Sequence, residues 1–231
     1  MSATSIVAEA RILVLLAWFF FGLLPVEAVI GQETRPPLFA GLFSSGSLDG
    51  WEEKEFSSKS TYQLKVMDGS TVLGAIAENG ASGLFKKQTV DLRQYPFLNW
   101  QWRVEEGHPL LAETTKKGDD YAARVYVIVD GGLFFWKTIA INYVWSSSQK
   151  KGSRWPNAFA GENAMLLAVR SDVDGDQTMK WYREKRNLRR DFKELFDLDV
   201  ETIDGVAIMT DSDNSGGRVT AYYGDIFFTA Q

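Results

Sequence analysis

The sequence contains no cysteine and a single histidine among its 231 residues. The absence of cysteine excludes disulfide bonds, thiol nucleophiles, cysteine-based zinc sites and lipid attachment through cysteine. The lone His108 stands in a loop between Gly107 and Pro109, and no G-x-S-x-G motif accompanies it. A Ser-His-Asp hydrolase is therefore disfavoured. Excess positive charge is lacking too, because the formal net charge is −5. A nucleic-acid partner has no electrostatic support at the level of the whole chain.

The N-terminal hydrophobic run is too short to span a membrane. It extends from Ile12 to Val26 and is interrupted by Pro25, whereas a span needs roughly 20 residues. Arg11 precedes the run, and the small-x-small pattern Val26-Glu27-Ala28 ends it. Residues 1–28 are predicted to be a secretory signal peptide; an uncleaved N-terminal anchor is the alternative. We expect a periplasmic or secreted protein with no membrane span after cleavage.

Aromatic side chains and short apolar runs are abundant in the remainder of the chain. Aromatics make up 13% of the sequence, and such rings fill the space between sheets or stack on ligands. Residues 29–38 are predicted to be a linker, and residues 39–231 a single domain. Strands are predicted for the runs Tyr62–Val66, Val72–Ala77, Ala81–Phe85, Leu98–Val104, Tyr121–Val129, Phe134–Val144 and Ala164–Arg170. Because one face of each run is polar, antiparallel pairing is favoured.

One segment departs from this pattern and predicts a helix. Arg186–Phe196 has apolar residues with helical spacing at Leu188, Phe192, Leu195 and Phe196. Asn187 can serve as its N-cap. Many short strands with one helix predict an all-β fold, an antiparallel two-sheet β-sandwich with one short amphipathic helix near the C-terminus.

Four stretches of the chain are distinctive, namely Gly118–Val127, Asn142–Ser147, Arg186–Leu188 and Met209–Ser215. Together they resemble a bacterial family of unknown function, DUF3047, and the resemblance covers nearly the whole mature chain. Because this family has no established activity, the resemblance implies an exported protein but no catalytic residues. The ends Leu48–Trp51 and Gly224–Ile226 are also similar to jelly-roll carbohydrate-binding modules.

A turn rich in oxygen ligands separates two apolar runs near the C-terminus. Val206–Thr210 and Val219–Phe228 are predicted to pair as a β-hairpin around it. Asp211, Asp213 and Ser215 match the first half of a calcium loop, but Tyr222 stands where the bidentate Glu belongs. We predict that Asp211, Asp213 and Asp225 cluster and are satisfied by calcium or by an arginine. A polar turn that bonds its own backbone is the alternative.

A second set of candidates lies on the predicted strand that follows Asp119. Alternation places Asp120, Arg124 and Tyr126 on one face and Asp119 on the other. An Asp–Arg pair on a sheet face can hold ligand hydroxyl groups, and it can equally anchor one strand to the next. Asn142 and Trp145 on the next apolar run complete the predicted ligand-binding residues. Trp136 and Trp155 are further candidates for an aromatic platform, although core packing is the commoner place for tryptophan.

The run Lys180–Arg190 is basic and contains Trp181 and Tyr182. It could face an anionic polysaccharide, although such a run is more often the solvated side of a helix. These features favour an exported, non-catalytic module that binds an envelope glycan or another polyhydroxylated ligand. The alternatives are a glycoside hydrolase or polysaccharide lyase on the same fold, which needs two carboxylates facing one cleft, and a purely structural envelope protein.

Overall fold

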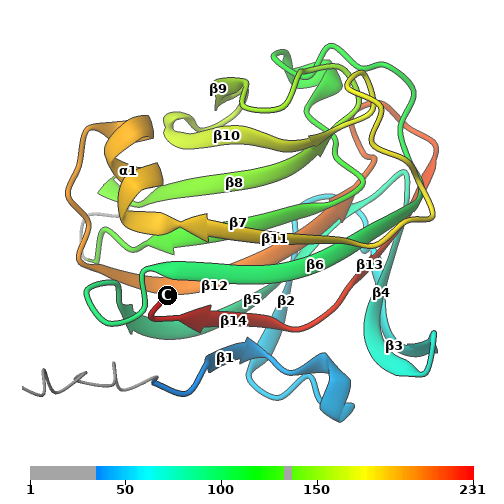
Figure 1. The fold of residues 1–231 in the computed structure, drawn as a ribbon. Coiled ribbons are helices and arrows are strands. Elements are labelled where there is room, and N and C mark those ends of the chain that lie inside the picture. The colour runs from blue at the N-terminus through cyan, green and yellow to red at the C-terminus, as the bar shows by residue number, and fades with distance from the viewer. Residues whose placement is uncertain (1–34, 133–136) are drawn as a thin grey trace, which may run out of the picture. The chain divides into compact units, whose positions relative to one another are not determined.

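The computed structural model describes residues 35–132 and 137–231. In these residues the chain forms two seven-stranded sheets, one α-helix and two short 3-10 helices, η1 (Phe43–Ser45) and η2 (Lys116–Gly118) (Figure 1). The predicted signal peptide, most of the predicted linker and Trp136 lie outside the described residues. No helix within the described ranges has the length and hydrophobicity that crossing a membrane requires.

The first sheet has the strand order β1-β14-β6-β13-β4-β3, with β11 on the other side of β6. Its strands are β1 (Leu38–Gly41), β3 (Thr61–Met67), β4 (Ser70–Glu78), β6 (Phe97–Glu106), β11 (Tyr182–Asn187), β13 (Arg218–Tyr223) and β14 (Ile226–Thr229). All of its pairings are antiparallel. Strand β6 is its centre, because β13 and β14 follow one another along one edge while β11 pairs with the other.

The second sheet has the strand order β2-β5-β12-β7-β8-β10-β9. Its strands are β2 (Trp51–Glu55), β5 (Ala81–Asp91), β7 (Arg124–Val129), β8 (Ile139–Ser146), β9 (Arg154–Asn157), β10 (Gly161–Ser171) and β12 (Thr202–Asp211). Its pairings are antiparallel, as the sequence favours, except that β8 and β10 are parallel. The segment 147–160 is long enough to bring the chain back before β10 begins, as a parallel connection requires.

The two sheets enclose one large hydrophobic core. Strand β6 shows the predicted alternation, because Leu98, Trp100, Trp102 and Val104 are all buried in that core. The ring of Trp100 lies 5.2 Å from that of Tyr143 in the opposite sheet. Aromatic side chains of this size join two sheets without any covalent link. The predicted two-sheet sandwich is thus confirmed.

The predicted hairpin between Val206–Thr210 and Val219–Phe228 is wrong. Strand β12 pairs with β5 and β7 in the second sheet, whereas β13 pairs with β4 and β6 in the first. The turn 212–217 therefore carries the chain from one sheet to the other. Two consecutive apolar strands can satisfy their backbone groups with other neighbours, and sequence proximity alone does not decide the pairing.

The predicted helix is confirmed as α1 (Leu188–Phe196). The side chain of Asn187 accepts a hydrogen bond from the backbone N–H of Arg190 and caps the helix. Leu188 and Phe192 are buried, and Leu195 and Phe196 pack partly against the core. Figure 1 shows α1 at one end of the molecule, directly after β11. Most of the basic run Lys180–Arg190 is strand β11 rather than the solvated side of a helix.

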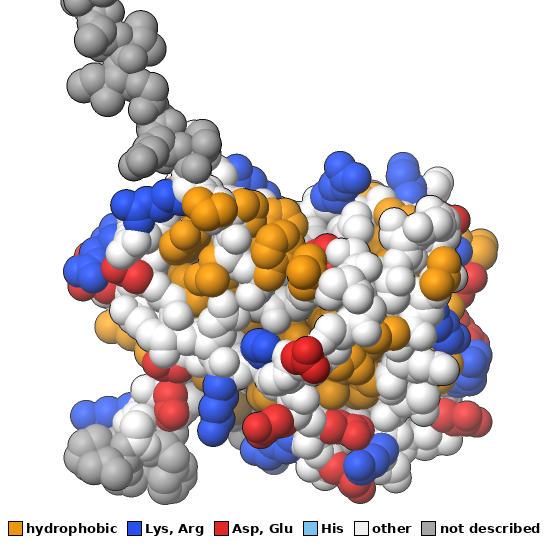
Figure 2. Space-filling view, turned by 90° about the horizontal axis from the view of Figure 1, so that it is seen from below, with side chains coloured by type: hydrophobic (Ala, Val, Ile, Leu, Met, Phe, Trp, Pro, Cys, Tyr) orange, Lys and Arg blue, Asp and Glu red, His pale blue; other side chains and the backbone are white. Residues whose placement is uncertain are grey.

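The surface does not carry one continuous hydrophobic face in the view of Figure 2. Hydrophobic side chains there form separate patches with charged side chains between them. Large hydrophobic residues that are exposed within the described ranges include Phe39, Leu42, Phe56, Val66, Leu110, Phe159, Val173, Met179 and Leu198. Scattered exposed residues of this kind are normal, so a site must be found from a hollow rather than from exposure alone.

Candidate functional site

A pocket of about 440 Å³ lies on the outer face of the second sheet. The inner face of β7 carries Val125 and Val127, which belong to the core, so Arg124 and Tyr126 point outward. The same alternation turns Asn142 of β8 toward the pocket. The lining residues share this face or the loops beside it: Phe56, Ala81, Asp119, Arg124, Tyr126, Asn142, Asn157, Phe159, Ala160, Ala164, Met209, Asp211, Asp213 and Asn214. We call this hollow the sheet pocket.

A buried arginine forms the charged centre of the sheet pocket. Arg124 Nε donates to Asp211 Oδ1 at 3.0 Å, and Nη2 donates to Asp211 Oδ2 and to the Asp119 carbonyl oxygen, the latter at 2.7 Å. The guanidinium also lies over the Tyr121 ring, 4.3 Å from its centroid. Its remaining terminal nitrogen, Nη1, is 3.9 Å from Asp119 Oδ1, beyond hydrogen-bond distance. The arginine is thus fixed in place by Asp211, the Asp119 backbone and the Tyr121 ring.

Two buried side chains that line the sheet pocket have polar atoms without a hydrogen-bond partner. Asn142 is 1% exposed, and neither its Nδ2 nor its Oδ1 is paired. Asp119 Oδ1 is unpaired as well, whereas its Oδ2 accepts a hydrogen bond from Asn157 Nδ2 at 2.8 Å. Buried polar groups without partners cost free energy and are rare in folded proteins. A ligand that offers both hydrogen-bond donors and acceptors would satisfy these atoms.

Two exposed phenyl rings belong to the lining of the sheet pocket. Phe56, which follows β2, is 54% exposed, and Phe159, between β9 and β10, is 58% exposed. Each ring has a lysine near it: Lys54 Nζ lies 5.3 Å from the Phe56 centroid and Lys116 Nζ lies 5.2 Å from that of Phe159. The pocket therefore combines aromatic surface with a buried polar floor.

Burial changes the ionisation of the carboxyl groups in the sheet pocket. It raises the pKa of Asp211 to about 7, against the opposing effect of Arg124. Burial also raises the pKa of Asp119 and of Asp213 above their ordinary value. Low dielectric surroundings disfavour the charged form of a carboxyl group. These three acids are therefore held closer to neutrality than exposed carboxylates.

Of the predicted ligand-binding residues, the structure brings Arg124, Tyr126 and Asn142 together at the sheet pocket. Asp120 lies next to the pocket but is not part of its lining: its carboxylate accepts hydrogen bonds from the backbone N–H groups of Asn214 and Ser215 and from the Ser215 hydroxyl. Although burial opposes it, this hydrogen bonding lowers the pKa of Asp120. The alternation that placed Asp120 on the face of Arg124 does not apply, because β7 begins only at Arg124. Asp119 takes the expected place instead.

Trp145 also lies away from the sheet pocket, in the core between the sheets. Its ring packs against those of Trp102 and Tyr182, and its Nε1 donates to Asp172 Oδ1 at 2.7 Å. Trp145 is three positions after Asn142 in the sequence. Because this difference is odd, the two side chains point to opposite faces of β8. Trp155 lies with Tyr121 in a small buried cluster.

The predicted carboxylate cluster is only partly formed. Asp211 and Asp213 lie together with Asp120, and their oxygen atoms are within 4.8 Å of one another. Asp225 is not among them, because it accepts hydrogen bonds from the backbone N–H and the hydroxyl of Ser44, at 2.8 and 2.6 Å. Arginine is the partner of Asp211, which is one of the two predicted solutions. A calcium ion would have to compete with Arg124 for both Asp211 oxygens, so the geometry does not favour a metal at this position.

His108 stands beside the same turn. Its Nε2 lies 2.9 Å from the Asp211 carbonyl oxygen and donates to it. Burial lowers the pKa of His108, so the ring is neutral near pH 7. This geometry gives His108 a role in holding the turn, and no serine nucleophile contacts it among the described hydrogen bonds.

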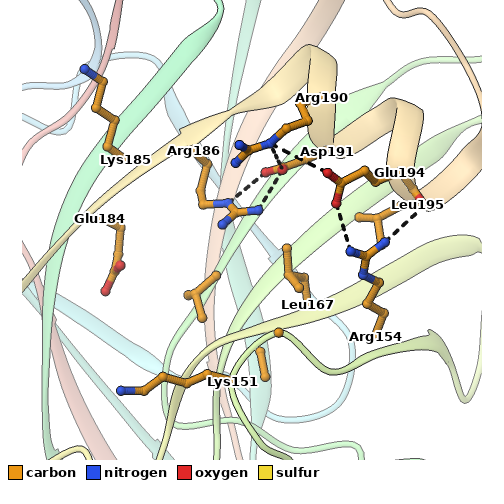
Figure 3. Close-up of a pocket in the computed structure, with 13 residues that line it drawn as sticks. Lys151, Arg154, Leu167, Glu184, Lys185, Arg186, Arg190, Asp191, Glu194 and Leu195 are labelled. Carbon is orange, nitrogen blue, oxygen red and sulfur yellow. Dashed lines mark hydrogen bonds and ion pairs between the residues drawn. The ribbon is translucent and has the colours of Figure 1, made fainter.

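A second hollow, of about 380 Å³, lies between α1, β11 and β10 (Figure 3). Three arginines beside it, Arg154, Arg186 and Arg190, are paired with Asp191 and Glu194 of α1 in Figure 3. Arg186 Nε and Nη2 bond Asp191 at 2.8 and 2.6 Å, and Arg154 Nη2 bonds Glu194 Oε2 at 2.8 Å. Arg190 Nε lies 3.8 Å from each of these two acids. The basic run is therefore part of an ion-pair network that ties the helix to the strands, and the sheet pocket remains the stronger candidate site.

No curated protein matches the sequence significantly. Solved structures that resemble the chain at low identity include a carbohydrate-binding module of the β-sandwich superfamily, with 13% identity and a TM-score of 0.46 over 82% of this chain and 61% of that one. The chain thus spans less than two thirds of that protein. A family 11 carbohydrate-binding module from Clostridium thermocellum has 9% identity and a TM-score of 0.43 over 83% of this chain and 94% of that one. A lectin from Bauhinia forficata has 10% identity and a TM-score of 0.37 over 84% of this chain and 98% of that one.

A family model described as a protein of unknown function, DUF3047, matches residues 49–227. This range includes the whole turn 212–217 and all the residues that line the sheet pocket. Because the match covers most of the sequence, the chain belongs to the DUF3047 family.

Proposed function

We propose that this protein is a non-catalytic module that binds a glycan or another polyhydroxylated ligand in the sheet pocket. The observation that carries the proposal is Asn142, which is buried with both amide atoms unpaired in the lining of a hollow. The carboxamide of Asn142 can both donate and accept a hydrogen bond. The hydroxyl groups of a sugar can do the same, so the two are complementary. Asp119 Oδ1 adds an acceptor beside it.

The aromatic surface supports the same class of ligand. Sugar rings have apolar C–H faces as well as hydroxyl groups, so they need both ring surface and polar partners. Phe56 and Phe159 supply exposed rings, while Asn142, Arg124 and Tyr126 supply polar atoms. Binding pockets commonly combine a mostly apolar lining with a few precisely placed polar groups.

A binding measurement tests this proposal directly. The protein without residues 1–28 is titrated with neutral oligosaccharides of different linkage by calorimetry, after an array of glycans has identified candidates. We expect Asn142→Ala and Phe159→Ala each to weaken binding at least tenfold. The first removes hydrogen bonds to the hydroxyl groups, and the second removes the aromatic surface under the sugar ring. Leu110→Ala is the matched control, since Leu110 is exposed and does not line the pocket.

The control variant should retain the affinity of the unchanged protein. If no glycan binds at millimolar concentration, or if the pocket variants bind as well as Leu110→Ala does, the proposal is wrong.

A second candidate is a glycoside hydrolase or polysaccharide lyase that uses the same pocket. It is favoured by the presence of Asp119 and Asp213 in one lining, both with a pKa raised by burial. Raised pKa values suit a general acid. Against it, both oxygens of the third acid, Asp211, are occupied by Arg124. Chromatography of oligosaccharides after long incubation decides between the two: shorter products that disappear with Asp119→Asn would establish the enzyme.

The predicted export of the protein is consistent with this proposal. An apolar run preceded by Arg11 and ended by Val26-Glu27-Ala28 supports export. We therefore place the binding function in the periplasm or outside the cell, where envelope glycans are accessible.

A further inference from the structure

Acidic groups outnumber basic groups in the sheet pocket. Among the residues that the structure describes, Asp119, Asp211 and Asp213 line it against one guanidinium, that of Arg124. Arg124 is committed to Asp211, which leaves Asp119 and Asp213 without a cation in hydrogen-bond contact. Asp119 is almost fully buried, and the partner of its Oδ2 is the neutral amide of Asn157. The pocket therefore has an excess of carboxyl groups over cations at its floor, and Asp119 lacks the cationic partner that would stabilise its charged form.

The unpaired atoms of the pocket indicate which ligand group would compensate the excess of carboxyl groups. Asp119 Oδ1 is a buried acceptor with no donor. An ammonium group has three donors and a positive charge, and its hydrogen bond to a carboxylate is about twice as strong as a neutral one. Asn142, whose amide atoms are also free, can bind the hydroxyl groups next to such an amine on a sugar ring.

We propose that the sheet pocket selects a glycan with free amino groups, a de-N-acetylated hexosamine, whose ammonium group pairs with Asp119 Oδ1. This inference rests on the proposed function and names its ligand class. It also disfavours uronic acids at the floor of the pocket, because a ligand carboxylate there would lie beside Asp119 and Asp213 while Arg124 is already paired with Asp211. The anionic polysaccharide suggested by the basic run Lys180–Arg190 does not fit this pocket.

The acetylated sugar is the most informative comparison. N-acetylation removes the charge of the amine but adds an acetyl group, whereas glucose has an uncharged hydroxyl group of similar size in its place. A preference for the amine over both sugars therefore reports the ion pair with Asp119. Overall attraction between an acidic protein and a cationic sugar is a competing explanation, since the net charge is −5. A control that removes an acid elsewhere on the surface separates the two.

Calorimetry at pH 6 with four tetrasaccharides tests the inference: β-1,4-linked glucosamine, N-acetylglucosamine and glucose, and α-1,4-linked galacturonate. We expect glucosamine to bind at least tenfold more tightly than the acetylated and glucose forms, and galacturonate to show no binding. Asp119→Asn should remove the preference for glucosamine and leave the affinity for glucose within about threefold. Asp199→Asn, at an exposed acid outside the pocket, should retain the full preference.

The outcomes separate this inference from the proposed function. Equal binding of glucosamine and glucose, tighter binding of galacturonate, or an equal loss of preference in Asp199→Asn would overturn the inference and leave glycan binding standing. If none of the four sugars binds and no other glycan does, both proposals fail. The preference is measured first on the unchanged protein, so an Asp119→Asn variant that does not fold would leave the test decisive.

Discussion

At the scale of single residues, Asn142 shows a conflict between stability and binding. Its amide is buried without partners, and an unsatisfied buried polar group costs about 1–3 kcal/mol. Natural proteins keep such costly groups at sites that need them. Asn142, which supports a ligand site, should therefore lower the stability of the fold.

We predict that Asn142→Leu leaves the free energy of unfolding unchanged or raises it by about 1 kcal/mol, because an apolar side chain of similar volume removes the unpaired amide. Urea denaturation measures this change, and calorimetry should show that ligand binding is lost. Asn157→Leu is the control, because it breaks the hydrogen bond to Asp119 and should destabilise the protein. A loss above 2 kcal/mol in Asn142→Leu would mean that its amide is paired in solution.

The buried pair of Asp211 and Arg124 predicts a pH dependence of stability. Burial raises the pKa of Asp211 to about 7, whereas the unfolded chain has an ordinary value near 3.9. The folded state therefore binds more protons between these values, and this contribution to stability is complete below pH 4 and is lost as the pH rises through 7. His108 acts in the opposite direction, because burial lowers its pKa and the unfolded state therefore binds more protons at this residue.

The effect of Asp211 is isolated by a comparison with Asp211→Asn, which retains His108. We expect the wild-type free energy of unfolding to fall relative to that of the variant between pH 4 and pH 8, by up to about 4 kcal/mol. Chemical denaturation at a series of pH values measures the difference. Parallel curves for the two proteins would show that Asp211 titrates at an ordinary pKa.

At the scale of elements, α1 is a short helix that depends on its buried face. Isolated helices of nine residues are not stable in water, so packing must maintain α1. Phe192 is fully buried, and we predict that Phe192→Ala costs about 3–5 kcal/mol. Phe159→Ala is the control at an exposed ring and should change the free energy of unfolding by less than about 0.5 kcal/mol. Urea denaturation would contradict the packing if Phe192→Ala cost under 1 kcal/mol.

The strands show which part of the fold sequence patterns can predict. Period-two alternation correctly assigned the buried face of β6, and helical spacing with Asn187 as cap correctly assigned α1. The pairing of β12 and β13 was wrong because alternation defines a strand's faces but not its neighbours. The turn 212–217 is long enough to reach the other sheet, and only the positions of β4, β5, β6 and β7 decide that it does.

The candidate site was predictable to the extent that it lies on regular strand. Arg124, Tyr126 and Asn142 occupy outward positions of β7 and β8, so their common face follows from alternation. Asp119 precedes the strand, where alternation does not apply, and Phe56 and Phe159 come from segments about one hundred residues apart in sequence. A pocket that draws on loops in this way is assembled by topology, which local patterns do not contain.

At the scale of the whole molecule, export is the first prediction. If residues 1–28 are a signal peptide, N-terminal sequencing of the protein recovered from outside the cytoplasm should begin near Val29. Replacing apolar residues in the run Ile12–Val26 with charged ones should retain the protein in the cytoplasm with Met1 or its neighbour at the N-terminus. An intact N-terminus on exported material would instead support an uncleaved anchor.

The first described elements determine how much of the N-terminus the fold needs. Strand β1 pairs with β14, Phe43 of η1 is fully buried, and Ser44 donates both its backbone N–H and its hydroxyl to Asp225. The chain has no disulfide to hold this segment, so packing and these hydrogen bonds must do so. We predict that a chain beginning at Val29 melts at the same temperature as the exported protein, whereas one beginning at Ser47 loses β1 and η1 and is destabilised by at least about 3 kcal/mol, as expected for removal of one buried phenylalanine. Phe43→Ala in the longer chain should account for most of that loss, because it empties the same position without removing the strand. If the chain beginning at Ser47 were as stable as the longer one, β1 and η1 would be peripheral, and Asp225 would be free to take part in another site.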